Sequence, residues 1–246
     1  MRPAVALVAV AALALPACGD DAGATVTVLA AASLTDAFAV LARTFEVDHP
    51  GATVEVSSGA SSSLATAIVE GAPADVFASA SPAAMAEVVD AGAAAGPPVD
   101  VAANVLEIVV PRGNPGEVAG LADLARGDLL VGLCAEEVPC GVVAARVLDD
   151  AGVTPATDTE EADVRALLTK VAAGELDVGL VYETDVIAAG DEVEGIPLPP
   201  DAPAGTRYPM AVLDGAEDPD LAEAFVDLVA GPEGRRVLRD LGFRAP

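Results

Sequence analysis

The chain has 246 residues and a formal charge of −27, with 39 acidic residues against 12 basic ones. Such an acidic chain argues against a general role in binding nucleic acid or an anionic membrane surface. Its length allows one large domain or two lobes with a sizeable hydrophobic core.

The N-terminus predicts export from the cytoplasm. An uncharged and mostly apolar run follows Arg2 at residues 4–17, and it is too short to cross a bilayer. We predict that residues 1–17 are a signal peptide and that residues 18–24 are a tether; a buried first helix is the alternative. Leu15-Pro16-Ala17-Cys18 resembles a bacterial lipoprotein processing site, so Cys18 is the predicted lipidation site. The expected location is the outer face of the cell membrane, or the periplasm or medium if Cys18 carries no lipid.

Strands and helices alternate along the rest of the chain. Apolar and β-branched runs predict strands at 25–30, 53–56, 75–78, 105–110, 129–133, 178–182 and 208–213. Helical apolar spacing predicts helices at 34–45, 64–69, 83–91, 142–148, 163–172, 219–229 and 232–241. This order predicts an α/β fold of two lobes, with mostly parallel sheets flanked by helices. A ligand is expected in the cleft between the lobes, at strand-to-helix turns.

Two of these turns are rich in serine. In the first, at residues 30–36, Ser33 lies among small residues at a helix start, where N–H donors and the helix dipole suit an anion. The alternative is a helix cap, because Ser33 and Asp36 nearly form a capping box. The second turn holds five serines between residues 57 and 63, including Ser61 and Ser62, which exceeds what a cap needs.

Two later turns offer further donors. Val164 stands at a predicted helix start, where its backbone N–H could donate whatever the side chain. Tyr182 ends an apolar strand, so its hydroxyl could reach the cleft; a tyrosine satisfied within the core is the alternative.

Cys134 and Cys140 form an even pair once Cys18 is set aside. Export makes a disulfide the default expectation. A zinc site would need four ligands, and the chain has a single histidine, His49. A redox pair usually has two residues between its cysteines, whereas five separate these. We therefore predict a Cys134–Cys140 disulfide.

Several motifs, taken together and in order, resemble the solute-binding protein of the molybdate ABC importer. They are Ala31-Ala32-Ser33-Leu34-Thr35, Gly71-Ala72-Pro73-Ala74-Asp75-Val76-Phe77, Val138-Pro139-Cys140-Gly141, Asp163-Val164-Arg165, Gly179-Leu180-Val181-Tyr182 and Tyr208-Pro209. The resemblance implies a periplasmic-binding-protein type II fold, with lobe I at 25–103 plus 206–246 and lobe II at 104–205. The two crossings of the chain between lobes are expected near 102–104 and 205–208.

The resemblance also implies which residues hold the oxyanion. Ser33 and Ser61 would each donate from the hydroxyl group and the backbone N–H, with Ser62 as the alternative to Ser61, and Tyr182 would donate from its hydroxyl group. Cys140 and Val164 would donate from their backbone N–H groups. A site made only of donors suits molybdate or tungstate, which are fully ionised near neutral pH.

The expected function is therefore an extracytoplasmic protein that delivers molybdate or tungstate to an ABC importer. Its expected partners are the permease and ATPase subunits of that importer, and we expect a monomer that needs no cofactor and is no enzyme. Molybdenum would enter only as its oxyanion, and no metal cation is expected. The alternatives are sulfate or another small anion in the same fold, a serine hydrolase using Ser61 or Ser62, and a surface adhesion or structural lipoprotein.

Overall fold

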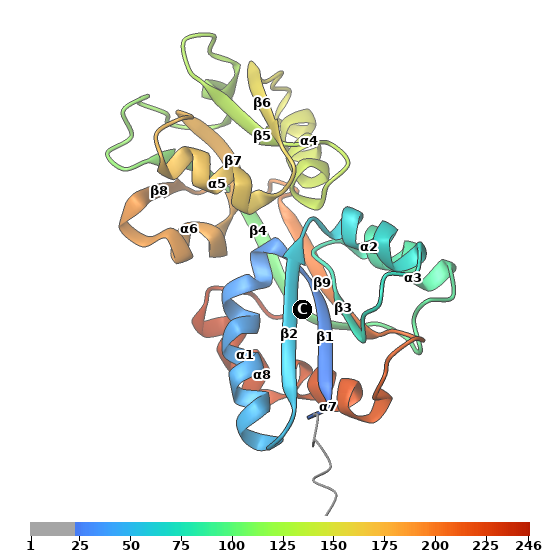
Figure 1. The fold of residues 1–246 in the computed structure, drawn as a ribbon. Coiled ribbons are helices and arrows are strands. Elements are labelled where there is room, and N and C mark those ends of the chain that lie inside the picture. Colours follow the sequence, from blue (N-terminus) through green and yellow to red (C-terminus); the bar gives the residue numbers. More distant parts are fainter. Residues whose placement is uncertain (1–22) are drawn as a thin grey trace, which may run out of the picture.

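The computed structural model describes residues 23–246. The predicted signal peptide, Cys18 and most of the predicted tether lie outside the described residues. Two parts of the molecule stand one above the other and are joined by two long strands, β4 (Val99–Pro111) and β9 (Gly205–Val212) (Figure 1). Within residues 23–246, no helix has both the length and the apolar character to cross a membrane.

Each part combines strands with helices, which confirms the predicted α/β class. Lobe I, the lower part in Figure 1, contains β1 (Thr25–Ala31), β2 (Thr53–Gly59), β3 (Val76–Ala78), α1 (Thr35–Asp48), α2 (Ser61–Val69), α3 (Pro82–Asp90), α7 (Pro219–Ala230) and α8 (Pro232–Asp240). Lobe II contains β5 (Val131–Cys134), β6 (Thr157–Glu161), β7 (Val178–Tyr182), β8 (Val193–Ile196), α4 (Pro139–Ala151), α5 (Val164–Ala172) and α6 (Glu183–Ala189). Short 3-10 turns are η1 (Ala32–Leu34), η2 (Leu121–Ala125) and η3 (Gly190–Glu192). The exact residues that bound each lobe stay a prediction.

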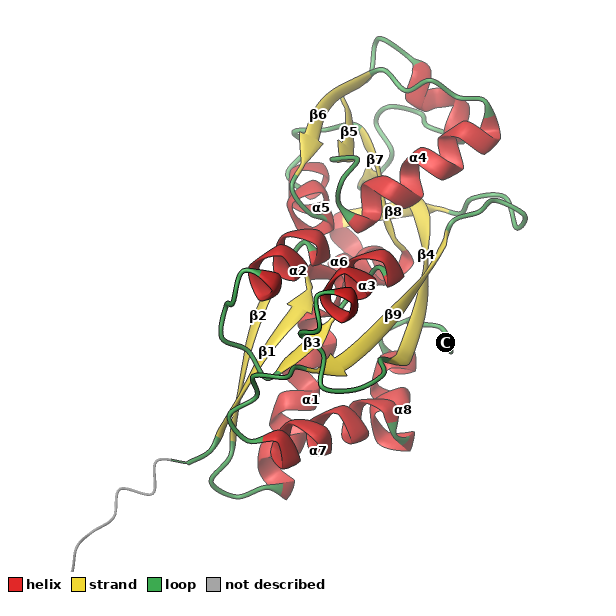
Figure 2. Ribbon diagram, turned by 90° about the vertical axis from the view of Figure 1, so that its right-hand side faces the viewer, coloured by secondary structure: helices red, strands yellow, loops and turns green. Residues whose placement is uncertain are grey.

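A continuous path of paired strands runs through both lobes in the order β2-β1-β3-β9-β4-β7-β5-β6, and β8 pairs with β4 beside this path. The pairings of β1 with β2 and β3, and of β5 with β6 and β7, are parallel. Every pairing that involves β4 or β9 is antiparallel. Figure 2 shows these two strands running from one lobe toward the other. The central ladder is therefore the connection that both lobes share.

The sheet of lobe I is covered on both faces, because alternate residues of a strand point to opposite sides. Helices α1, α7 and α8 pack on one face around Val28 and Phe225. The ring of Phe225 meets Phe45 edge-on, with centroids 5.3 Å apart. Helices α2 and α3 pack on the other face against Phe77. Lobe I therefore has a layer of helices on each side of its sheet.

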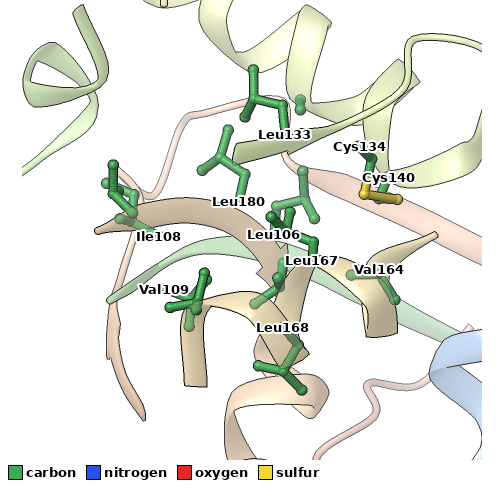
Figure 3. Close-up of a cluster of buried hydrophobic side chains, with 14 of the residues drawn as sticks. Leu106, Ile108, Val109, Leu133, Cys134, Cys140, Val164, Leu167, Leu168 and Leu180 are labelled. Carbon is green, nitrogen blue, oxygen red and sulfur yellow. A yellow bond between two sulfur atoms is a disulfide. The ribbon is translucent and has the colours of Figure 1, made fainter. Parts of the chain in front are cut away.

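Lobe II encloses a separate core of aliphatic side chains. Leu106 and Ile108 of β4, Leu180 of β7 and Leu167 of α5 are buried in it (Figure 3). The Cys134–Cys140 disulfide lies at the edge of this cluster, toward the same side as Val164. One wall of the core is therefore shared with the region where α4 and α5 begin.

Several elements differ from the sequence-based expectation. Helices α2 and α4 each begin three residues earlier than expected, at Ser61 and Pro139. Serine and proline favour first turns but carry no apolar periodicity, so the pattern did not include them. Strand β4 begins six residues early, at Val99. β6, α6 and β8 were not predicted, and β6 is a mostly exposed edge strand of polar residues.

Gly132 in β5 should be needed for the close packing of Leu167 and Leu176 against the sheet of lobe II. A Cβ atom at Gly132 would lie 2.4 Å from Leu176 Cδ1 and 2.8 Å from Leu167 Cδ1. We expect Gly132→Ala to lower the free energy of unfolding by about 1–3 kcal/mol through overpacking, measured by urea unfolding. The control is Gly127→Ala, where a Cβ atom meets open space. Equal unfolding midpoints for both variants would contradict this account.

Candidate functional site

A small cavity lies between the two lobes, with a volume of about 230 Å³ including its open mouth. Five strand-to-helix turns and Tyr182 surround it. The lining residues are Ala31, Ala32, Ser33, Gly59, Ala60, Ser61, Ala80, Val138, Pro139, Cys140, Asp163, Val164 and Tyr182. The structure thus brings together five of the residues singled out in the sequence, although they are up to 149 positions apart, as Ser33 and Tyr182 are.

Ser33 lies in the 3-10 turn η1 between β1 and α1, and only 4% of its surface is exposed. Its hydroxyl oxygen is 2.9 Å from the hydroxyl oxygen of Tyr208. Ser33 makes no capping hydrogen bond, and the side chain of Asp36 is instead paired with Arg165. The capping-box alternative for Ser33 is therefore wrong, because both side chains have other partners.

Ser61 is the first residue of α2 and is 1% exposed. Its Oγ accepts a hydrogen bond of 2.9 Å from the backbone N–H of Ala80. Since that N–H can only donate, the hydroxyl proton of Ser61 remains available for another acceptor. Ser62 is half-buried and does not line the cavity. The structure therefore places Ser61, and not Ser62, at the predicted site.

Cys140 is the second residue of α4 and is joined to Cys134 by a disulfide, with Cα atoms 5.8 Å apart. The predicted disulfide is thereby confirmed. The loop between the cysteines folds tightly over the helix start, because a Cβ atom at Gly141 would lie 1.9 Å from the carbonyl oxygen of Ala135. The N–H groups of the first turn of a helix have no acceptor within the helix. The bridge therefore holds the N–H of Cys140 at the cavity wall.

Val164 begins α5, and the residue before it, Asp163, caps the helix. The Asp163 carboxylate accepts from the N–H groups of Arg165 at 2.8 Å and Ala166 at 2.9 Å. This cap leaves the N–H of Val164 without a side-chain acceptor, and Val164 lines the cavity. The carboxylate next to the cavity is therefore used for capping, and the free donor of this turn is the Val164 N–H.

Tyr182 ends β7 and is 1% exposed. Its hydroxyl oxygen is buried and has no hydrogen-bond partner among the described residues. Burial raises the pKa of Tyr182 well above its usual value, and nearby Tyr208 and Asp185 raise it further. The hydroxyl therefore keeps its proton at neutral pH. A buried donor without a partner at a cavity wall indicates a position for a ligand acceptor.

No lysine or arginine lines the cavity. Arg165 follows the lining residue Val164 directly in the sequence, but it has two carboxylate partners. It pairs with Asp36 of α1, and its Nε lies 3.3 Å from Asp185 Oδ1. The first of these ion pairs joins the two lobes. The hydroxyl and N–H donors of the cavity are therefore neutral, and Arg165, the cation beside it, is already paired.

Sequence reasoning missed three groups at the site: the N–H of Ala80, the hydroxyl of Tyr208, and Asp185. Tyr208 belongs to one of the motifs, but nothing in the sequence predicted that it contacts Ser33, which lies 175 positions away. Asp185 accepts a hydrogen bond from the N–H of Tyr182 at 3.2 Å and is fully buried. An ionisable residue next to an apolar strand end was the one available signal for it.

Comparison with known proteins gives consistent matches. A family model described as bacterial extracellular solute-binding protein matches residues 26–244. The molybdate-binding protein ModA of Mycobacterium tuberculosis is 40% identical over 222 residues, 90% of this chain and 85% of that protein. The periplasmic molybdate-binding protein of Azotobacter vinelandii has a TM-score of 0.78 at 24% identity, covering 90% of this chain and 99% of that chain. The sulfate-binding protein SubI of Mycobacterium tuberculosis has a TM-score of 0.79 at 21% identity, covering 90% and 87%. The structural likenesses establish the fold alone, and they confirm the predicted periplasmic-binding fold.

Asp185 should make stability depend on pH. Burial raises its pKa from 3.8 to about 7, although the Arg165 cation opposes this. Between these two values the folded protein binds a proton that the unfolded chain releases, so stability falls as the pH rises from about 4 to about 7. We expect Asp185→Asn to remove this fall, a difference on the order of 2–4 kcal/mol across the window, measured by urea unfolding.

The control for this pH series is Asp191→Asn, which removes an exposed carboxylate six residues later. It should leave the pH dependence of the wild type unchanged. A wild-type slope that persists in Asp185→Asn would refute the assignment to Asp185.

Proposed function

The chain belongs to the family of bacterial extracellular solute-binding proteins, and we propose that it captures molybdate or tungstate between its lobes for an ABC importer. The observation that carries this proposal is a cavity lined by donors that have no acceptor of their own. The proposed ligand set is Ser33, Ser61 and Tyr182 through their hydroxyl groups, and Cys140 and Val164 through their backbone N–H groups. A relative that is 40% identical and is a molybdate-binding protein supports the same ligand.

The donors of the cavity favour a fully ionised tetrahedral oxyanion. Such an anion brings only acceptors, so every donor finds a partner and no proton of the ligand needs an acceptor from the protein. Five hydrogen bonds to a charged ligand, at about 1.5–3 kcal/mol each, supply roughly 8–15 kcal/mol. Association costs at least ~4 kcal/mol of this, which leaves micromolar binding within range.

Sulfate is the second candidate ligand, because it is also fully ionised and the sulfate-binding protein SubI shares the fold. That likeness at 21% identity bears on the fold and not on the ligand. The 40% identity to a molybdate-binding protein over 90% of the chain favours molybdate.

A serine hydrolase finds no support in the structure. The single histidine, His49, directly follows the last residue of α1. Its ring stacks on Phe45, and its Nδ1 lies 3.0 Å from the Phe45 carbonyl oxygen. It does not line the cavity. Ser61 therefore has no histidine to act as a general base.

The proposed partners are the membrane permease and the ATPase of the importer, as the solute-binding family implies. We propose that the protein acts as a monomer without a cofactor and that it performs no catalysis. Lipidation at Cys18, which would tether it to the outer face of the membrane, remains part of the proposal.

Calorimetric titration tests the ligand and its donors together. We expect wild-type protein to bind molybdate or tungstate more tightly than sulfate or phosphate. Ser33→Ala and Ser61→Ala should each weaken molybdate binding by ~10- to 100-fold, since each removes a hydrogen bond to a charged ligand. Ser62→Ala is the matched control from the same helix turn, and it should bind like the wild type.

Two outcomes would count against this proposal. Tight sulfate binding without a response to molybdate would assign the cavity to the other oxyanion. A loss of affinity in Ser62→Ala with none in Ser61→Ala would exchange the roles of these two serines.

The disulfide should contribute to ligand affinity as well as to stability. On the chain-entropy model, opening a loop this short costs about 2 kcal/mol of stability. Without the bridge the Cys140 N–H must be ordered when the ligand binds, so we expect Cys134→Ala/Cys140→Ala to bind molybdate ~10-fold more weakly while remaining folded. Calorimetry and thermal unfolding of the same sample measure both effects. Unchanged affinity in the double variant would reject this role.

A further inference from the structure

A chain of four buried polar side chains begins at Ser33 and crosses both long strands. Ser33 meets Tyr208 of β9 at 2.9 Å between their hydroxyl oxygens. Asn104 of β4 places its Nδ2 3.4 Å from the Tyr208 hydroxyl and 2.8 Å from Oγ1 of Thr184 in α6. Each of these four residues is at most 4% exposed. The chain thus connects the predicted anion donor Ser33 with the strands that join the lobes.

The donor and acceptor roles along these four side chains are fixed at Asn104. The backbone N–H of Val105, which can only donate, lies 3.0 Å from Asn104 Oδ1. The amide oxygen must therefore face Val105, and the amide nitrogen must face Tyr208 and Thr184. Both N–H groups of the Asn104 side chain are donors, so the Tyr208 oxygen accepts from one of them.

The proton of Tyr208 then has one available acceptor. Burial holds the pKa of Tyr208 above its usual value, so the hydroxyl keeps its proton. Among the described residues, the Tyr208 hydroxyl is within hydrogen-bond distance of Asn104 and Ser33 only, and the Asn104 nitrogen is a donor. A buried hydroxyl proton requires an acceptor, so Tyr208 donates to the oxygen of Ser33.

We propose that Tyr208 and Asn104 are positioning residues that orient the Ser33 hydroxyl so that its proton faces the cavity and its oxygen is occupied. Ser33 is then held as a donor to the ligand, and Tyr208 fills one of the two acceptor positions of its oxygen. Ser61 reaches the same state by another route, because its oxygen accepts from the Ala80 N–H. The inference rests on the proposed function and adds its selectivity: an oxyanion that carries a proton, such as hydrogen phosphate, meets at both serines a hydroxyl that is already held as a donor, with one acceptor position of its oxygen filled.

Tyr208→Phe tests this inference, because it removes the proton given to Ser33 and keeps the ring that packs edge-on against Phe243 and Tyr182. We expect molybdate affinity to fall ~3- to 10-fold, as for one neutral hydrogen bond. In the variant the Ser33 hydroxyl is no longer held as a donor and can turn its oxygen toward a protonated ligand, so the ratio of molybdate to phosphate affinity should also fall. A purely structural role would weaken both anions alike.

A double-mutant cycle shows whether Tyr208 acts through Ser33. In the Ser33→Ala background, Tyr208→Phe should change molybdate affinity by less than ~2-fold. The control is Thr159→Val, which deletes a buried hydroxyl that lies in β6 and has no hydrogen-bond partner among the described residues. It should leave both affinities unchanged.

The outcomes separate the inference from the proposed function. Wild-type protein that binds none of molybdate, tungstate, sulfate or phosphate overturns both. Wild-type protein that binds molybdate, with equal losses for Tyr208→Phe in both backgrounds or an unchanged selectivity ratio, overturns only the inference. Neutron diffraction of wild-type crystals with bound oxyanion shows the proton directly: deuterium on the Tyr208 oxygen pointing to Ser33 supports the inference, and deuterium on Ser33 pointing to Tyr208 refutes it.

Discussion

The antiparallel ladder between β4 and β9 is the constraint on which the rest of the structure depends. It pairs residues 99–105 with residues 205–210, and the outer strands of each lobe add to it in turn. Ala102 lies opposite Tyr208, and Asn104 lies opposite Thr206. Because strands are held at fixed spacing by their hydrogen bonds, this register decides which turns face each other across the cavity. The two residues that orient Ser33 are part of the ladder itself.

An acidic protein with a proposed anion site faces an electrostatic difficulty, because its net charge repels the ligand. The formal charge of −27 is spread over the surface and is screened within about 8 Å at physiological ionic strength. The cavity instead presents hydroxyl groups and first-turn N–H groups, which are short-range donors. Arg165 beside the cavity is paired with Asp36 and lies against Asp185, so it is not free to meet a ligand. Local dipoles therefore determine binding, and the net charge acts only at long range.

The sequence predicts local features well and contacts between distant positions poorly. The alternation of strands and helices, the cysteine pair and the serine turns follow from patterns within a few residues, and these predicted the α/β fold and the disulfide. The choice between Ser61 and Ser62 depends on which side of a helix faces Ala80, which needs the start of α2 to be known to the residue. The contact between Ser33 and Tyr208 joins positions that only the tertiary fold brings together.

The position of the two cores along the chain has a consequence for biosynthesis. The core of lobe II is formed almost entirely within one stretch, from Leu106 to Ala204, and Ala32 and Ala60 are the buried residues that join it from earlier in the described chain. In lobe I, Val26 and Val28 near the beginning pack with Phe225 and Leu238 near the end. The first strand to emerge from the ribosome or the secretion channel must therefore wait for the last helix, since domains fold as units. Lobe II can therefore complete most of its core first, whereas lobe I lacks part of its core until α7 and α8 have been synthesised.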